Sequence, residues 1–208
     1  MTTTTPAAAA RNPKMGRYIG IGIVVVLILY LISLYNGIMN ADETVNQKWG
    51  DVESNYKRRY DLIDNLVNTV KGAADFEKST LTELVEARAK ATSITIDPAT
   101  ATPEQIKAFM AAQSGVSTSL GRLLAVVENY PQLTATQAYR DLMVSLEGTE
   151  NRINVARMDY NEAVKNYNVR IRKFPGNLIA GIAGLDRRNT FDAPEGVEDV
   201  PKVDFGTK

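Results

Sequence analysis

The chain has 208 residues, 44% of them hydrophobic, and contains no histidine and no cysteine. These two absences exclude His-based general bases, Ser-His-Asp and Cys-His nucleophile sites, CxxC redox pairs and the histidine-containing zinc and di-iron motifs. The 24 basic residues balance the 24 acidic ones, so the chain carries no net field that would hold nucleic acid. No EF-hand-like, P-loop or dinucleotide-binding pattern is present. We therefore expect no enzyme, metal site or cofactor.

An apolar run from Tyr18 to Tyr35 stands near the N-terminus, and no charged residue lies between Arg17 and Asp42. Eighteen helical residues at about 1.5 Å each reach roughly 27 Å, close to the thickness of a hydrocarbon core. We place a transmembrane anchor at residues 18–39, which makes the lipid bilayer an expected partner. An uncleaved anchor is favoured over a cleaved signal peptide, because the run is long and no Ala-x-Ala-like pattern follows it. The lack of cysteine excludes a lipoprotein signal.

Charge bias predicts how the anchor crosses the membrane. Three basic residues and no acidic one precede the apolar run, whereas acidic residues outnumber basic ones directly after it. Lys57, Arg58 and Arg59 follow within about twenty residues and weaken this bias without reversing it. We expect a single-pass protein of the plasma membrane, with a cytoplasmic N-terminus and the following domain outside the cytoplasm. Residues 1–17 are expected to be a flexible basic arm.

Beyond the anchor, apolar residues recur with helical spacing. Eight positions alternate steps of four and three residues, which predicts an amphipathic helix continuous with the anchor. These positions are Val45, Trp49, Val52, Tyr56, Arg59, Ile63, Leu66 and Val70. A break between Lys71 and Phe76 and a shorter second helix are expected next. The segment from Thr92 to Thr102 is expected to be a loop.

Capping patterns predict where two further helices start. Thr102-Pro103-Glu104-Gln105 offers an N-cap, a proline at the first helical position and a reciprocal capping partner. Thr134 to Gln137 repeats the capping pattern for a fourth helix. Its 3,4 alternation runs from Tyr139 to Tyr167, and Phe174-Pro175-Gly176 stops it.

Four amphipathic helices with short connections predict an all-α fold. We expect an N-terminal transmembrane helix followed, at residues 42–174, by an antiparallel up-and-down four-helix bundle. The alternative has three long helices, with the first two segments continuous through Gly72. Residues 175–208 are expected to be an apolar linker and an acidic flexible tail. Within them, Leu178 to Leu185 lies on the membrane surface, packs under a neighbouring protomer or is a disordered linker, and these alternatives stay open.

Four signatures follow one another beyond the anchor. They are Trp49-Gly50-Asp51-Val52 running on to Asn65-Leu66-Val67, then Glu128-Asn129-Tyr130-Pro131-Gln132-Leu133, then Leu146-Glu147-Gly148-Thr149-Glu150-Asn151-Arg152-Ile153 running on to Tyr167-Asn168, and finally Phe174-Pro175-Gly176-Asn177 with Pro201-Lys202-Val203-Asp204-Phe205. In this order they resemble the bacterial LemA family. The resemblance implies a single-pass membrane protein with an up-and-down four-helix bundle and no established enzymatic activity. Asp64 stands where relatives usually carry proline, so a straighter first helix is expected here.

Polar residues interrupt the apolar seams of two helices. Arg59 lies on the seam of the first, and Glu150 and Asn151 flank Thr149 on the seam of the fourth. Because a lone charge on a seam is costly, we expect a structural polar network. Its candidate members are Arg59, Asp61, Glu150 and Asn151. The alternative is a regulatory or sensor subunit that binds a small anion or peptide near Arg59 and Glu150.

Aromatic residues lie on or beside the same two seams. Tyr56, Tyr60, Tyr160 and Tyr167 are expected to form a core layer whose hydroxyls reach polar edges. Trp49, the single tryptophan, is likewise expected in the core.

The sequence as a whole therefore favours a non-enzymatic, membrane-anchored helical module of the bacterial cell envelope. We expect it to self-associate as a scaffold or to act as an adaptor. Besides the bilayer, the expected partner is a second copy of the chain or another envelope protein.

Overall fold

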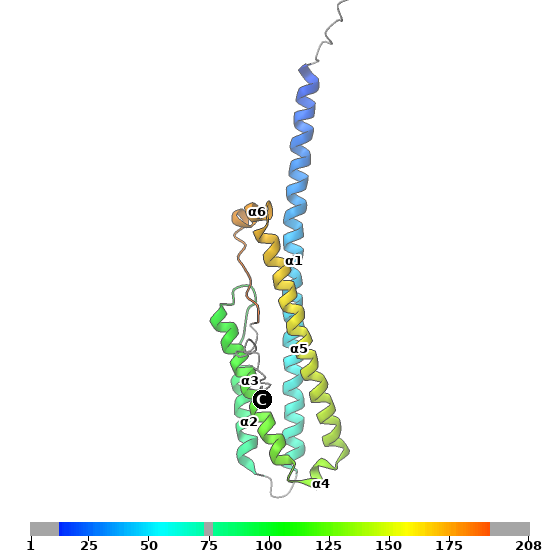
Figure 1. The fold of residues 1–208 in the computed structure, drawn as a ribbon, viewed down its shortest axis with the longest axis vertical. Coiled ribbons are helices and arrows are strands. Elements are labelled where there is room, and N and C mark those ends of the chain that lie inside the picture. The colour runs from blue at the N-terminus through cyan, green and yellow to red at the C-terminus, as the bar shows by residue number, and fades with distance from the viewer. Residues whose placement is uncertain (1–12, 73–76, 192–208) are drawn as a thin grey trace, which may run out of the picture.

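The computed structural model describes residues 13–72 and 77–191 of the chain (Figure 1). The described residues form helices and no strand, which confirms the expected all-helical class. The helices are α1 (Pro13–Lys71), α2 (Lys78–Thr92), α3 (Pro103–Val127), α4 (Pro131–Thr134), α5 (Gln137–Arg172) and α6 (Gly176–Ala183).

Helix α1 carries the apolar run without interruption into the rest of the protein (Figure 1). It has 59 residues, which at 1.5 Å each is roughly 88 Å. Its most apolar window of 18 residues has a mean hydropathy of 2.5 and is not buried. Among the described helices it is the one that is long and apolar enough to cross a membrane. The helix begins at Pro13, so residues 13–17 of the expected N-terminal arm are helical, and residues 1–12 lie outside the described residues.

Two pairs of helices form the part of the protein beyond the apolar run. Helix α1 packs mainly on α5, and α2 mainly on α3. Successive long helices alternate in direction, with α1 and α3 running one way and α2 and α5 the other (Figure 1). Because α1 ends at Lys71 and α2 begins at Lys78, the first two segments are separate helices. Most of the expected break, residues 73–76, lies outside the described residues.

The cap of α3 is the one that the sequence predicts. The Gln105 amide N–H donates to the Thr102 hydroxyl at 3.3 Å, and the Thr102 N–H donates to Gln105 Oε1 at 2.8 Å. The predicted cap of the fourth helix is wrong by two residues. Thr136, rather than Thr134, caps α5 by accepting a hydrogen bond from the Tyr139 N–H at 3.3 Å. Thr134 instead ends the short helix α4, which starts at Pro131 because proline suits a first helical position.

The buried apolar side chains form two clusters at different heights along the helices. The aromatic cluster, which is nearer the apolar run of α1, includes Trp49, Tyr56, Phe109, Tyr160, Tyr167 and Phe191. The aliphatic cluster, at the far end, includes Ile63, Leu66, Val70, Leu84, Val116 and Leu123. Trp49 is 3% exposed, so the prediction that it belongs to the core is confirmed.

The described part of the chain beyond α5 forms a short helix and an extended segment that end at Phe191. Helix α6 packs against α1 and α5, and Gly184, at φ 65°, closes it. Residues 185–191, which we name the strap, then run back along α5 (Figure 1). The expected linker therefore contains a helix, and the expected acidic tail at 192–208 lies outside the described residues.

Gly176 provides a direct test of how α6 is seated. A Cβ at this position would overlap the carbonyl oxygen of Arg170, which is backbone and cannot swing aside. We expect Gly176→Ala to lower the free energy of unfolding by about 1–3 kcal/mol, the usual cost of overpacking. The measurement is chemical denaturation of the detergent-solubilised chain, followed by circular dichroism.

Gly121→Ala is the matched control. Nothing lies within 4 Å of a Cβ at Gly121, inside α3, so this change should stabilise the protein by about 0.5–1 kcal/mol. Equal losses of stability in both variants would contradict the close seating of α6.

Candidate functional site

A buried polar layer lies between the aromatic and aliphatic clusters. Arg59 on α1 is 2% exposed, Gln113 on α3 is 4% exposed and Thr149 on α5 is fully buried. They are the buried polar residues among those described. Three helices thus contribute one polar side chain each.

Arg59 is the centre of this layer. Its Nη2 donates to Gln113 Oε1 at 2.5 Å, and its Nη1 lies 3.3 Å from both Ser117 Oγ and Glu150 Oε2. Its guanidinium carbon stands 5.0 Å from the centre of the Tyr56 ring, in cation–π range. The guanidinium therefore joins α1 to both α3 and α5.

The two members of the Arg59–Glu150 pair have different environments. The Arg59 side chain is 3% exposed, whereas that of Glu150 is 48% exposed. Water therefore screens the carboxylate, and the buried amide of Gln113 is the main partner of the buried charge. The Nε2 of Gln113 in turn donates to the Tyr60 hydroxyl at 2.5 Å.

The other two candidate members of the polar network lie elsewhere. Asp61 and Asn151 are exposed, and no described contact joins either of them to Arg59. The reason is helical geometry, because two residues along a helix turn a side chain by about 200°. Gln113 was missed by the sequence reasoning, although its place between Phe109 and Val116 on the apolar seam of α3 was the available signal.

An open pocket of about 420 Å³ lies beside the polar layer, between α3 and α5. Its lining residues are Arg59, Ser117, Leu120, Gly121, Leu124, Met143, Leu146, Glu147 and Glu150. Because the Arg59 side chain is enclosed and hydrogen-bonded to protein groups, little of its charge faces this space. The described residues also contain no group of three or more His, Cys, Asp or Glu that could hold a metal ion.

A second polar arrangement binds the strap to α5. The Tyr160 hydroxyl donates to the Asn189 carbonyl, and the Tyr167 hydroxyl donates to the Asp186 carbonyl, each at 3.0 Å. These bonds satisfy two phenols that are otherwise buried in the aromatic cluster. Of the four tyrosines in the expected layer, Tyr160 and Tyr167 reach the strap, whereas Tyr60 contacts Gln113.

Two asparagines each hold one strap residue from both sides. Asn168 donates to the Arg188 carbonyl at 2.8 Å and accepts from its N–H at 3.0 Å. Likewise, Asn161 donates to the Phe191 carbonyl at 3.0 Å and accepts from the Phe191 N–H at 2.8 Å. Side-chain amides here take the place of a neighbouring β-strand.

The spacing of these contacts follows from two geometries. The Tyr-Asn pair at 160–161 recurs seven residues later at 167–168, a rise of roughly 10.5 Å on a helix. The strap residues bound by the two tyrosines, Asn189 and Asp186, are three residues apart, which spans roughly 10 Å of extended chain. Two Tyr-Asn repeats on α5 therefore bind two three-residue units of the strap in register.

The strap also reaches the other helices. The Arg188 guanidinium pairs with Asp42 on α1 at 2.7 Å, and both side chains are mostly buried. Asn189 donates to the Ala101 carbonyl, in the loop before α3, at 2.9 Å. The Phe191 ring stacks on Trp49 with centroids 5.6 Å apart. One short segment thus connects α1, α5 and the α2–α3 loop.

Burial changes the pKa of the tyrosines in the aromatic cluster. Burial raises the pKa of Tyr160 from 10.0 to about 12, and it also raises the pKa of Tyr56 and Tyr167. These phenols therefore stay protonated near neutral pH. The arrangement fixes the position of the strap.

The region that contains both polar arrangements matches a known family. The LemA family pattern matches residues 48–205. The chain belongs to the LemA family. Arg59, Gln113 and both Tyr-Asn pairs lie within the match, whereas the apolar run of α1 precedes it.

Proteins similar to this chain include magnetosome proteins and a protein named LemA. The chain is 31% identical over 205 residues to "Magnetosome protein MamQ 2" of Paramagnetospirillum magneticum, covering 90% of this chain and 75% of the relative. It is 28% identical to "Magnetosome protein MamQ" of Magnetospirillum gryphiswaldense, with the same coverage. It is 24% identical over 172 residues to "Protein LemA" of Metamycoplasma hominis, covering 83% of this chain and 73% of that protein.

The unequal burial of the partners of Arg59 leads to a prediction about stability. Gln113→Ala removes the buried acceptor of a buried charge, so we expect a loss of about 3 kcal/mol in the free energy of unfolding. Glu150→Ala removes a half-exposed partner and should cost about 1 kcal/mol or less. Denaturation curves of the two variants and the unchanged chain would measure this difference. The reverse ranking would show that Glu150, rather than Gln113, compensates the Arg59 charge.

The strap contacts predict a pattern of hydrogen exchange. Replacing both Asn161 and Asn168 by alanine removes the acceptors of the Arg188 and Phe191 N–H groups. Exchange at these two amides should then accelerate by about tenfold or more, since local opening is no longer opposed. Asn166→Ala, on the exposed side of α5, is the control and should leave both rates unchanged. Unchanged protection in the double variant would mean that other contacts hold the strap.

Proposed function

We propose that the chain is a non-enzymatic, membrane-anchored scaffold that pairs with a second copy through the outward face of α5. The observation that carries this proposal is a row of exposed apolar side chains on that helix. They are Val144, Val155, Met158 and Val169, with exposed fractions of 71%, 57%, 71% and 38%. Steps of 11, 3 and 11 residues bring them within about 60° of one another around the helix. We name this row the α5 stripe.

The packing of the helices holds α5, and with it the α5 stripe, in position. In this proposal α1, α2, α3 and α5 act as an antiparallel up-and-down four-helix bundle. Their alternating directions and the two shared core clusters favour that description. One face of α5 is buried in this bundle, and the α5 stripe lies on the exposed face.

Anchoring in one membrane restricts how two copies can meet. If both α1 helices cross the bilayer in the same sense, both α5 helices run in the same direction at the same height. A twofold axis normal to the membrane then brings the α5 stripe against itself in register. The stripe is roughly 37 Å long, from 25 residues at 1.5 Å each. Glu162, which also lies on this face, can meet Lys165 of the second copy.

The composition of the sequence favours a role without catalysis, because it contains no histidine and no cysteine. The names of the MamQ relatives refer to the magnetosome and to no reaction, which fits a scaffold or adaptor. A sensor role near Arg59 and Glu150 has less support, because Arg59 is enclosed by protein.

The proposed location follows from the sequence and from α1. The apolar run would cross the inner membrane once, with the N-terminus in the cytoplasm and the helical domain outside it. The exposed apolar window of α1 supports the crossing, and the charge bias around it supports the orientation.

Cysteine crosslinking in living cells tests both the pairing and the orientation, because the natural chain contains no cysteine. With Val155→Cys, we expect a bis-maleimide to produce a homodimer, identified by mass spectrometry. The control is Glu86→Cys on the exposed face of α2, which should give none. Adding Met158→Asp to Val155→Cys should abolish the dimer, since a carboxylate would be desolvated in the contact.

Each other outcome has a defined meaning. Monomers alone, or equal dimers from both positions, would overturn self-association through α5. Crosslinks from Val155→Cys to one other envelope protein would replace it with an adaptor role. A membrane-impermeant reagent should work as well as a permeant one, and success with the permeant reagent alone would overturn the proposed orientation.

A further inference from the structure

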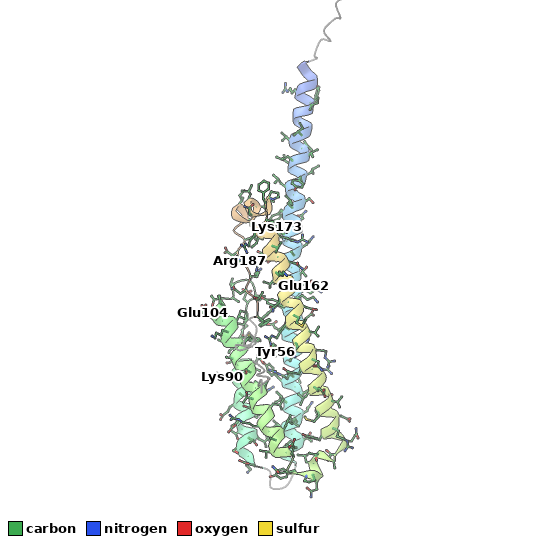
Figure 2. All side chains as sticks on the ribbon, viewed as in Figure 1. Tyr56, Lys90, Glu104, Glu162, Lys173 and Arg187 are labelled. Carbon is green, nitrogen blue, oxygen red and sulfur yellow. The ribbon has the colours of Figure 1, made fainter. Side chains whose placement is uncertain are left out.

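A basic pocket opens beneath α6, between α5 and the strap. Its volume is about 580 Å³. The lining residues are Lys165, Asn168, Val169, Arg172, Lys173, Arg187, Arg188, Asn189 and Thr190. Five of these carry a positive charge and none carries a negative one. Figure 2 shows Lys173 and Arg187 on the side of the molecule where α6 lies.

The positive charge of this pocket is largely uncompensated within the described residues. Arg188 pairs with Asp42, but Lys165, Arg172, Lys173 and Arg187 form none of the ion pairs seen there. Arg188 is 8% exposed, and its Nη1 is buried without a hydrogen-bond partner. Because the other four cationic side chains line one open space without an acidic residue among the lining residues, the pocket is suited to an anion.

Exposed apolar side chains mark the surface above the pocket. Phe174, Leu178 and Ile182 are 80%, 57% and 90% exposed. Leu178 and Ile182 are four residues apart, so they share one face of α6. The opposite side of α6 packs near Ile38, which is 3% exposed and comes directly after the apolar run of α1. The exposed apolar face of α6 and the end of the apolar run of α1 therefore lie at a similar height along α1.

The height of these groups along α1 matches the layers of a bilayer. A hydrocarbon core of about 30 Å takes about 20 helical residues, so a core that starts at Arg17 ends close to Gly37. Helix α6, beside Ile38, lies at that boundary. Asp42, the partner of Arg188, lies four residues further, about 6 Å along the helix. The headgroup region is about 5–7 Å thick on each side, so Arg188 lies at headgroup depth.

We propose that this pocket binds the phosphate group of an anionic phospholipid while the apolar face of α6 enters the same leaflet. Arg172, Lys173 and Arg187 supply the free charge, and Arg188, held by Asp42, lines the pocket beside them. Guanidinium groups suit this ligand because they donate paired hydrogen bonds to phosphate oxygens. The inference requires α1 to cross the membrane. The pocket shares Val169 with the α5 stripe, but the proposed ligand contacts, Arg172, Lys173 and Arg187, lie outside the stripe.

Native mass spectrometry of the full-length chain in detergent tests the charge of the ligand. We expect bound phosphatidylglycerol to be retained over phosphatidylcholine by about tenfold or more. The triple variant R172Q/K173Q/R187Q should lose that preference. The control K57Q/R58Q/K71Q removes the same charge from exposed positions of α1 and should keep it.

Other results in this assay overturn the proposal. Equal retention of the two lipids, or equal loss in the triple variant and the control, would show that no specific headgroup site exists. Inorganic phosphate is added separately to distinguish the source of the phosphate. If millimolar inorganic phosphate displaces the lipid completely, the pocket is a site for a free anion instead.

A fluorophore on a single introduced cysteine tests the contact of α6 with lipid. The label on Ile182→Cys, in nanodiscs that contain phosphatidylglycerol, should be quenched by lipids with a nitroxide on the acyl chain. A label on Ala138→Cys, at the far end of α5, is the control and should stay unquenched. Equal quenching at both positions, or none at position 182, would overturn the insertion of α6. Because this readout involves no dimer, it can fail while the proposed pairing through α5 stands, and the reverse also holds.

Discussion

The buried charge of Arg59 is the constraint on which the arrangement of the long helices depends. A guanidinium enclosed between two apolar clusters must have acceptors, and those acceptors come from α3 and α5. Sliding any of the three helices along its neighbours would leave the charge without them, whereas aliphatic contacts alone would tolerate such a shift. The polar layer therefore specifies the heights of α1, α3 and α5, and the aromatic and aliphatic clusters supply the burial.

The strap fixes the positions of the helices at the end of the domain nearer the apolar run of α1. The apolar period of α5 accounts for its packing in the core. The two Tyr-Asn pairs on the same helix have a second role, because they bind the backbone of the strap. Because the Tyr-Asn pairs form hydrogen bonds with backbone carbonyl and N–H groups of the strap, these contacts do not require particular side chains in the strap. The side chains are thus free for other contacts, such as that of Arg188 with Asp42, and for the basic pocket.

Much of the fold could be predicted from the sequence, because its determinants are local. The period of the apolar residues predicted the long helices, and the cap at Thr102 was correct because proline and the reciprocal polar pair are adjacent in sequence. The start of α5 was missed because Thr134 and Thr136 both offer capping hydroxyls, and the interposed helix α4 decides between them. Gln113, and the role of Asn161 and Asn168, depend on segments far apart in the chain. No periodicity within one helix reveals such partners.

Because α1 is one continuous helix, a tilt of its apolar run also moves its far end. From Ile38, where burial begins, to Lys71 the helix extends about 50 Å beyond the apolar run. If the apolar run crosses a bilayer as proposed, a tilt of about 10°, well within the usual range for such helices, would displace the far end by roughly 9 Å, because no loop separates the two halves. A change in bilayer thickness or curvature would then become a lateral movement of the surface that carries α4.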